Sequence, residues 1–161
     1  MKKERILLEY DSFENESELP AASRELLEAA IAALDRAYAP YSHFQVAAAL
    51  RLANGELISG TNQENAAYPS GLCAERTAVF YAGSARPGIE IKEILVVARK
   101  EGRTELVPAC PCGACRQVMQ EAEERQGRPI QLIFRQEKTG FIRLGSVRHS
   151  LPFRFDPASL S

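Results

Sequence analysis

The chain has 161 residues, with 20 Lys plus Arg against 21 Asp plus Glu, two His, four Cys and no Trp. Its apolar share of 45% and charged share of 25% are those of an ordinary globular domain, which excludes a disordered or fibrous protein. A formal net charge of −1 leaves no electrostatic footprint for nucleic acid or for an anionic membrane surface. A small ligand is therefore expected rather than a polyanion.

The amino end and the apolar runs give no sign of export or of membrane insertion. The longest apolar stretches, such as residues 94–98, are far shorter than the roughly 20 residues that a membrane helix needs. Glu9 and Asp11 interrupt any apolar signal region at the amino end. We therefore expect a cytoplasmic protein, with residues 1–20 as a leader or arm that packs on the domain and residues 21–161 as a single domain.

The first half of the chain predicts a helix followed by a hairpin. Apolar residues recur with a period of 3.6 from about Pro20 to Tyr38, which indicates a helix, and proline is favoured at a helix start. Phe44, Val46, Ala48 and Leu50 alternate with Gln45, Ala47, Ala49 and Arg51, which indicates a strand, and Asn54 with Gly55 supplies turn chemistry before a second short strand.

The second half alternates helices and strands. Helices are predicted from about Cys73 to Gly83 and from about Cys112 to Arg125, the second ended by Gly127. Strands are predicted at residues 91–98, 130–134 and 141–144, and the first is nearly continuously apolar, as in a strand covered on both faces. This order predicts one mixed sheet with helices on its faces, an α/β fold.

The four cysteines form the most informative pattern. Cys73 and Cys112 fall at predicted helix starts, where free N–H groups and the positive end of the helix dipole stabilise thiolate, the form that binds metal. Cys112 and Cys115 are three residues apart and share one helix face. With Cys73 they can supply three ligands to Zn²⁺ and leave the fourth tetrahedral position open, as in a catalytic site.

Two residues beside Cys73 suit the same site. Glu75 is two residues from Cys73, which corresponds to about 200° around a helix, so periodicity alone does not place its carboxylate beside the metal. A long side chain at a helix end can, however, lean over the terminus and reach it. The pattern Cys-Ala-Glu followed by Pro-Cys-x-x-Cys matches the zinc deaminase signature, in which the Glu that is not a ligand moves protons. Three thiolates leave a net negative charge on zinc, and Arg76 is the candidate to offset it by hydrogen bonding to a ligand sulfur.

Four linked motifs extend this pattern, and together the sequence resembles the homotetrameric cytidine deaminases. They are Tyr38-Ala-Pro-Tyr-Ser-His-Phe44-Gln-Val-Ala-Ala-Ala-Leu50, Asn62-Gln-Glu64-Asn65-Ala-Ala-Tyr68, Cys73-Ala-Glu75-Arg76-Thr-Ala and Pro111-Cys112-Gly-Ala-Cys115-Arg116-Gln117. The resemblance implies a three-layer α/β/α sandwich with a mixed central sheet. It also implies hydrolysis of cytidine and 2′-deoxycytidine to the uridines with release of ammonia, as in pyrimidine salvage. One Zn²⁺ per subunit and a homotetramer with shared active sites complete the expectation.

The resemblance also assigns roles to single residues. It makes Cys73, Cys112 and Cys115 the zinc ligands and Glu75 the catalytic proton shuttle. For the base, it implies that the backbone N–H of Ala74 meets the pyrimidine carbonyl oxygen, that the backbone carbonyl of Cys110 lies near the leaving amino group, and that Phe44 stacks on the ring. For the sugar, it implies that Asn62 and Glu64 bind the ribose 3′-hydroxyl. It also implies that Phe155, rather than Phe153, enters a neighbouring subunit's site.

Four alternatives remain at this point. Cys110 could join the other cysteines in a structural four-thiolate zinc site, although a single residue separates it from Cys112 and structural pairs usually have two to four between them. The same chemistry could serve an altered cytosine nucleoside, such as an aminoacyl-cytosine antibiotic. A polynucleotide substrate is opposed by the charge balance and by Glu64, and the last alternative is a zinc-stabilised module with no activity.

Overall fold

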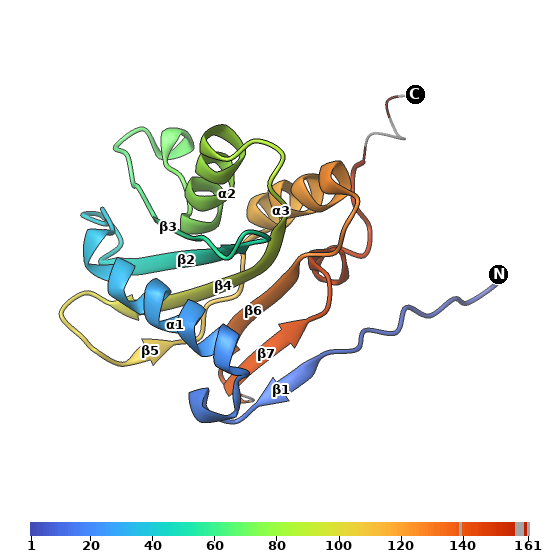
Figure 1. The fold of residues 1–161 in the computed structure, drawn as a ribbon, viewed down its shortest axis with the longest axis horizontal. Helices are drawn as coiled ribbons and strands as arrows, with labels where there is room; N and C mark the ends of the chain where they lie inside the picture. The colour runs from blue at the N-terminus through green and yellow to red at the C-terminus, as the bar shows by residue number, and fades with distance from the viewer. Residues whose placement is uncertain (139, 157–159, 161) are drawn as a thin grey trace.

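The strands of the structure form one mixed sheet (Figure 1). The structure is a computed structural model that describes residues 1–138, 140–156 and 160, so the end of the predicted domain at residue 161 lies outside it. The strand order is β1-β7-β6-β4-β2-β3, with β5 paired to β4, and among the described pairs only β4 and β6 run parallel. The strands are β1 (Asp11–Phe13), β2 (Phe44–Leu52), β3 (Leu57–Thr61), β4 (Ile91–Lys100), β5 (Leu106–Val107), β6 (Gln131–Gln136) and β7 (Gly140–Leu144).

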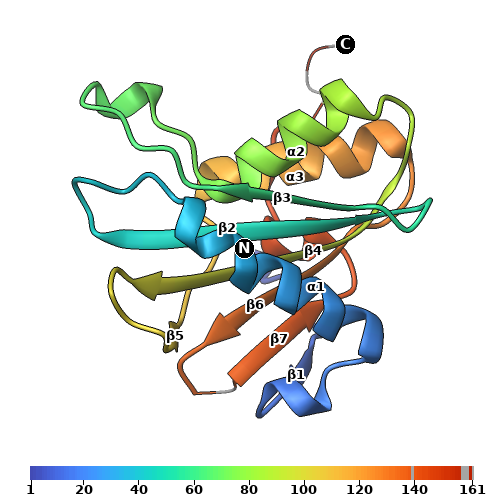
Figure 2. The ribbon, with the colours of Figure 1, turned by 60° about the vertical axis from the view of Figure 1, so that its left-hand side comes forward.

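Helices cover both faces of this sheet. The helix α1 (Ala21–Ala33) lies on one face, and α2 (Ala74–Ala85) and α3 (Gly113–Gln126) lie side by side on the other (Figures 1 and 2). The predicted α/β fold and its three-layer α/β/α arrangement are confirmed. In the part of the chain that the structure describes, we find no helix long and apolar enough to cross a membrane.

The central strand β4 separates two apolar cores. Ile94 and Val96 join the core beneath α2 and α3, whereas Leu95 and Val97 join the core beneath α1. Successive side chains of a strand point to opposite faces, so a strand buried on both faces is apolar at most of its positions. The prediction made from the continuous apolar run is confirmed.

The helix boundaries differ slightly from the predicted ones. The first helix was expected to reach Tyr38, but it ends at Ala33 and passes into a 3₁₀ turn at Leu34–Arg36. Pro40 follows closely and cannot supply the N–H of a continuing helix. The third helix ends as predicted at Gly127, whose φ of 64° lets its N–H reach the carbonyls of Glu123 and Glu124.

The helix α2 rests directly on the backbone of β3 at Gly60. A Cβ atom at Gly60 would lie 2.5 Å from the backbone nitrogen of Ala78 and 2.9 Å from the carbonyl oxygen of Ala74. We expect Gly60→Ala to lower the free energy of unfolding by roughly 1–3 kcal/mol, because overpacking moves α2 away from the sheet. Urea denaturation checks the loss.

Gly145→Ala is the matched control, because a Cβ atom there meets no atom within 4 Å. Equal stability of Gly60→Ala and the parent protein would show that β3 does not set the position of α2.

Candidate active site

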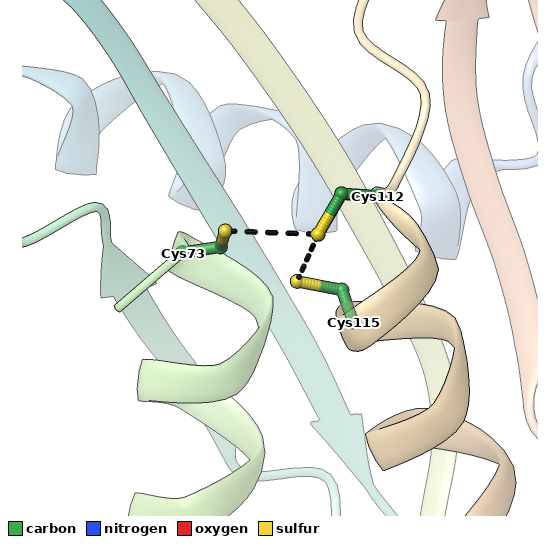
Figure 3. Close-up of side chains that lie close together, drawn as sticks. All are labelled: Cys73, Cys112 and Cys115. Atoms are coloured by element: carbon green, nitrogen blue, oxygen red, sulfur yellow. Dashed lines mark hydrogen bonds between the residues drawn. The ribbon is translucent and has the colours of Figure 1, made fainter. Parts of the chain in front are cut away.

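Three cysteine side chains converge where α2 and α3 begin (Figure 3). Cys73 is the residue before α2, Cys112 is the residue before α3, and Cys115 lies buried in the first turn of α3. The Sγ atom of Cys112 is 3.8 Å from that of Cys73 and 3.4 Å from that of Cys115. All three sulfur atoms lie within 4.8 Å of one another.

This spacing fits one zinc ion. Zinc–sulfur bonds of about 2.3 Å in a tetrahedron place sulfur atoms about 3.8 Å apart. Cys110 is not in the group, and its Sγ accepts a hydrogen bond of 3.0 Å from Nη2 of Arg116. The three cysteines therefore form a site for one Zn²⁺ with a fourth position left for another ligand, and the four-thiolate arrangement is not the one that the structure holds.

The protonation of the cysteines shows why a cation suits the site. Hydrogen bonds from Cys115 and Arg76 lower the pKa of Cys73 to about 5. The pKa of Cys115 is raised, because its thiol donates to Cys73 and because it is buried. The protein's own groups thus favour a thiolate at Cys73 and a protonated thiol at Cys115, whereas a divalent ion favours the deprotonated form of every ligand.

Arg76 lies against the ligand cluster, where the sequence placed it. Its Nη2 atom is 3.8 Å from Sγ of Cys73 and 3.4 Å from the carbonyl oxygen of Gly71. A guanidinium beside a ligand thiolate draws negative charge from the sulfur and fixes its orientation.

We expect Arg76→Ala to weaken zinc binding by about 10–100-fold, the usual cost of losing a residue that supports a metal ligand. Competition with a chromophoric chelator measures the change. Arg76→Lys keeps the charge but not the planar fork, so an intermediate affinity is expected for it. If Arg76→Ala held zinc as tightly as the parent protein, the guanidinium would have no part in binding the metal.

Glu75 is brought to the metal site despite its unfavourable helical phase. It lies in the first turn of α2, only 4% exposed, and lines the same cleft as Cys73 and Cys112. Burial raises the pKa of its carboxyl group, and the neighbouring Cys73 thiolate raises that pKa further, although a hydrogen bond from Cys115 acts in the opposite direction. A carboxyl group with a raised pKa beside a metal site is suited to carry a proton at neutral pH.

The cleft in front of the cysteines has a volume of about 920 Å³, which is in the range of small-molecule sites. It gathers most of the predicted site residues from four segments of the chain. Its lining includes Phe44, Val46, Asn62, Glu64, Cys73, Glu75, Arg76, Cys110 and Cys112.

Asn62 is fixed across from the start of β2. Its Oδ1 accepts a hydrogen bond of 2.9 Å from the N–H of Val46, and its Nδ2 donates one of 2.9 Å to the carbonyl of Phe44. An amide has two donor hydrogens and two acceptor lone pairs, so each of these atoms keeps one site for a ligand. The backbone contacts therefore orient the amide of Asn62 and leave it able to hydrogen-bond to a ligand.

Glu64 is held by a neighbouring loop. Its carboxylate accepts hydrogen bonds from the Ser42 hydroxyl and from the N–H groups of Tyr41 (3.0 Å) and Ser42 (3.3 Å). These bonds lower the pKa of Glu64, the Ser42 hydroxyl most of all, so the group stays negative at neutral pH. Sequence reasoning assigned no role to Tyr41 or Ser42, although both lie in the first of the four motifs.

Besides the buried ligand Cys115, two predicted residues do not line the cleft of this chain. Ala74 is buried at the first position of α2, where its N–H has no partner within the helix, so only its backbone could act on a ligand. Phe155 is 59% exposed, and its carbonyl accepts a hydrogen bond of 2.7 Å from Gln117. Its predicted place in a neighbouring subunit's site stays a prediction.

Arg116 is a residue that the sequence reasoning missed. Its Nε donates to the carbonyl of Pro111 (2.8 Å), its Nη1 to the carbonyl of Ser150 (3.2 Å) and its Nη2 to Sγ of Cys110. One guanidinium thus fixes the loop before α3 and the segment after β7. The only sequence signal was its place directly after Cys115.

Comparisons with known proteins agree with this geometry. Residues 20–127 match the family described as "Cytidine and deoxycytidylate deaminase zinc-binding region". A cytidine deaminase of Halalkalibacterium halodurans is 49% identical over 96 residues, which are 60% of this chain and 68% of that protein. A cytidine deaminase of Sporosarcina psychrophila is also 49% identical, over 55% of this chain and 61% of its own length. The crystal structure of a cytidine deaminase from Burkholderia pseudomallei has 44% identity and a TM-score of 0.66, and covers 81% of this chain and 97% of that one.

Proposed function

Because the chain belongs to the family of the cytidine and deoxycytidylate deaminase zinc-binding region, we propose that this zinc hydrolase converts cytidine and 2′-deoxycytidine to uridine and 2′-deoxyuridine and releases ammonia. The observation that carries the proposal is one cleft that holds a three-cysteine zinc site, a buried carboxyl group and a second, ionised carboxylate. The first two groups suit the hydrolysis, and the third suits a sugar hydroxyl.

Glu75 is the catalytic residue of this proposal. When bound, Zn²⁺ supplies the Lewis acidity that lowers the pKa of a water molecule. Glu75 takes the proton that the attacking water loses as its oxygen bonds to C4, and gives this proton to ring N3. It then carries the remaining proton of the new hydroxyl group to the amino nitrogen, so that the C4–N bond breaks, ammonia leaves and the oxygen becomes the carbonyl of the uridine. The raised pKa of its carboxyl group supports both directions of transfer.

The backbone at the two helix starts orients the base. We assign the N–H of Ala74 to the pyrimidine carbonyl oxygen, since an unpaired first-turn N–H favours an acceptor. The carbonyl of Cys110, on the loop that Arg116 holds, accepts from the amino group that leaves. Phe44, at the cleft wall, stacks on the base.

Asn62 and Glu64 select the sugar. An ionised carboxylate and an amide can bind one hydroxyl from two sides, and the pair lines the cleft together. The negative charge of Glu64 opposes a phosphate on the 3′-oxygen, so the substrate is a free nucleoside and not a residue within a polynucleotide strand.

The remaining parts of the proposal concern assembly and cellular role. We propose a cytoplasmic homotetramer of pyrimidine salvage in which Phe155 enters a neighbouring site. The exposed rings of Tyr41 and Tyr68, edge to face at 6.0 Å beside the cleft, support a protein contact there. Light scattering should give four times the chain mass of 17.8 kDa. A monomer that deaminates cytidine normally would contradict the shared site.

An ultraviolet assay on zinc-loaded protein tests the activity. We expect conversion of cytidine and 2′-deoxycytidine, with zinc measured in the same sample at one ion per chain. An aminoacyl-cytosine nucleoside is offered in competition, and preference for it would replace the proposed substrate. A fully loaded protein that converted none of these nucleosides would overturn the proposed activity and favour the zinc-stabilised module.

We expect cytidine 3′-monophosphate to be a poorer substrate than cytidine, with kcat/KM at least about 10-fold lower, because like charges in one site oppose binding. Cytidine 5′-monophosphate is the control for a phosphate on the other side of the sugar. Equal efficiency for cytidine and its 3′-phosphate would remove Glu64 from the ribose site.

A further inference from the structure

The first ten residues form an arm that carries exposed apolar side chains. We define the N-terminal arm as residues 1–10, and Figure 1 shows it running away from the rest of the molecule. Ile6 is 61% exposed, Leu7 84% and Leu8 47%. Consecutive exposed aliphatic side chains are unfavourable in water unless something covers them.

The arm starts from a fixed point at the edge of the sheet. Asp11 in β1 is paired with Arg143 in β7. Both Nε and Nη2 of Arg143 donate to Oδ2 of Asp11, at 3.0 and 2.7 Å, and the guanidinium lies 5.5 Å from the centre of the Phe13 ring. The direction in which the arm leaves the sheet is therefore set by β1.

Beyond β1, the described residues offer the arm no strand of its own chain to pair with. β7 ends at Leu144, and the chain then turns into a 3₁₀ helix at Val147–Ser150. β1 is also the last strand on its side of the sheet. Among the described residues, no hydrogen bond reaches residues 5–9, and an edge of this kind is a template for another strand.

The sequence of the arm is complementary to itself when it is read in opposite directions. In an antiparallel pair with a two-fold axis at Leu7, Arg5 faces Glu9 and Lys3 faces Asp11. Because both bonds from Arg143 end on Oδ2 of Asp11, Oδ1 can accept from a lysine. On the face of the strand that carries the odd-numbered residues 3–11, every charged residue thus meets an opposite charge.

The apolar residues match in the same register. Ile6 faces Leu8, and Leu7 faces its own copy on the axis. Shifting the axis by half a residue places Glu4 opposite Asp11 or opposite Glu9, and a pair of like charges directly opposite each other is destabilising.

We propose that the arms of two copies of this chain pair as antiparallel strands around a two-fold axis at Leu7, and that this pairing covers the exposed aliphatic side chains. A two-fold contact needs a surface that is complementary to itself, which this segment provides. If the arm bound a different protein, its sequence would not need to be complementary to its own reversed sequence. The pairing lies outside the catalytic cleft, so it stands or falls independently of the proposed activity.

Cysteine substitution in the full zinc-loaded chain tests the register. With oxidised glutathione, Leu7→Cys should give a disulfide-linked dimer as the main species on a non-reducing gel, because the two thiols meet on the axis. Arg5→Cys alone and Glu9→Cys alone should not link, since identical positions are then about 14 Å apart along the strands, too far for a disulfide. A mixture of these two variants should link.

Wild-type protein gives the background from the four native cysteines. Equal linkage of all three single variants would mean random collision of the arms and overturn the proposal, as would an unlinked Leu7→Cys. Arg5→Glu added to Leu7→Cys should reduce the yield of dimer, and Glu9→Arg added to both should restore it. A yield unaffected by Arg5→Glu would overturn the register.

Discussion

Glu75→Gln should keep one zinc ion per chain and lower kcat by about 10²–10⁴-fold, the usual contribution of a positioned proton carrier. The amide fills the same buried space, so the neighbouring cysteines keep their positions, but it cannot accept the proton that the attacking water loses. KM should change little, because the proposed contacts to the sugar come from other residues. Steady-state kinetics on cytidine with parallel zinc analysis checks the result.

Glu121→Gln, on an exposed position of α3, is the control for the same chemical change away from the cleft. It should leave kcat and zinc content at the parent values. A Glu75→Gln enzyme with kcat within a few-fold of the parent would end the assignment of Glu75 as the proton shuttle, whatever its zinc content.

The position of Glu75 shows what sequence periodicity could not predict. The three zinc ligands were predictable because helix starts and a three-residue spacing are local features. The phase of about 200° between Cys73 and Glu75 holds only if both residues are helical, but Cys73 precedes α2 with an extended backbone at φ −72° and ψ 156°. Because periodicity does not show at which residue a helix begins, it could not predict that Glu75 lies beside the zinc ligands.

The support of Glu64 was hidden for a different reason. Its partner Ser42 is 22 residues away, and the two loops meet because Tyr38 and Gln63 form an isolated bridge. The bridge itself involves backbone atoms, and backbone pairing does not depend strongly on residue type. The resemblance predicted Glu64 in the site but not the loop that keeps its carboxylate ionised.

The short strands at the edges were the least predictable part of the fold. β5 has only two residues and β1 three, too few for an alternation to be recognised. The leader was expected as an arm on the domain, and its strand pairs with β7 only through residues 11–13. The long strands and helices were predictable because each buries a continuous face that repeats with its own period.

The charge of the site connects the metal with its surroundings. The chain as a whole is nearly neutral, but three thiolates exceed the charge of one Zn²⁺ by one. Two helix starts and the guanidinium of Arg76 face this local excess. With Zn²⁺ bound, these positive groups would offset the charge of the three thiolates and so help the ion to lower the pKa of a water molecule, which a zinc ion with neutral ligands lowers more readily.

Cys112→Ser and Cys110→Ser should distinguish a cysteine that binds zinc from one that only lies near the zinc site. We expect Cys112→Ser to lose nearly all bound zinc on dialysis and all measurable activity, because a hydroxyl is a far weaker zinc ligand than a thiolate. Loss of a metal present at 1,000 times its Kd removes about 4 kcal/mol of stability, so the thermal midpoint should fall as well.

Cys110→Ser, two positions earlier, should keep one zinc ion, because its sulfur contacts Arg116 instead of the cluster. If Cys110→Ser lost its zinc as completely as Cys112→Ser, four thiolates would bind the ion, and no position would remain for the water that the proposed reaction needs.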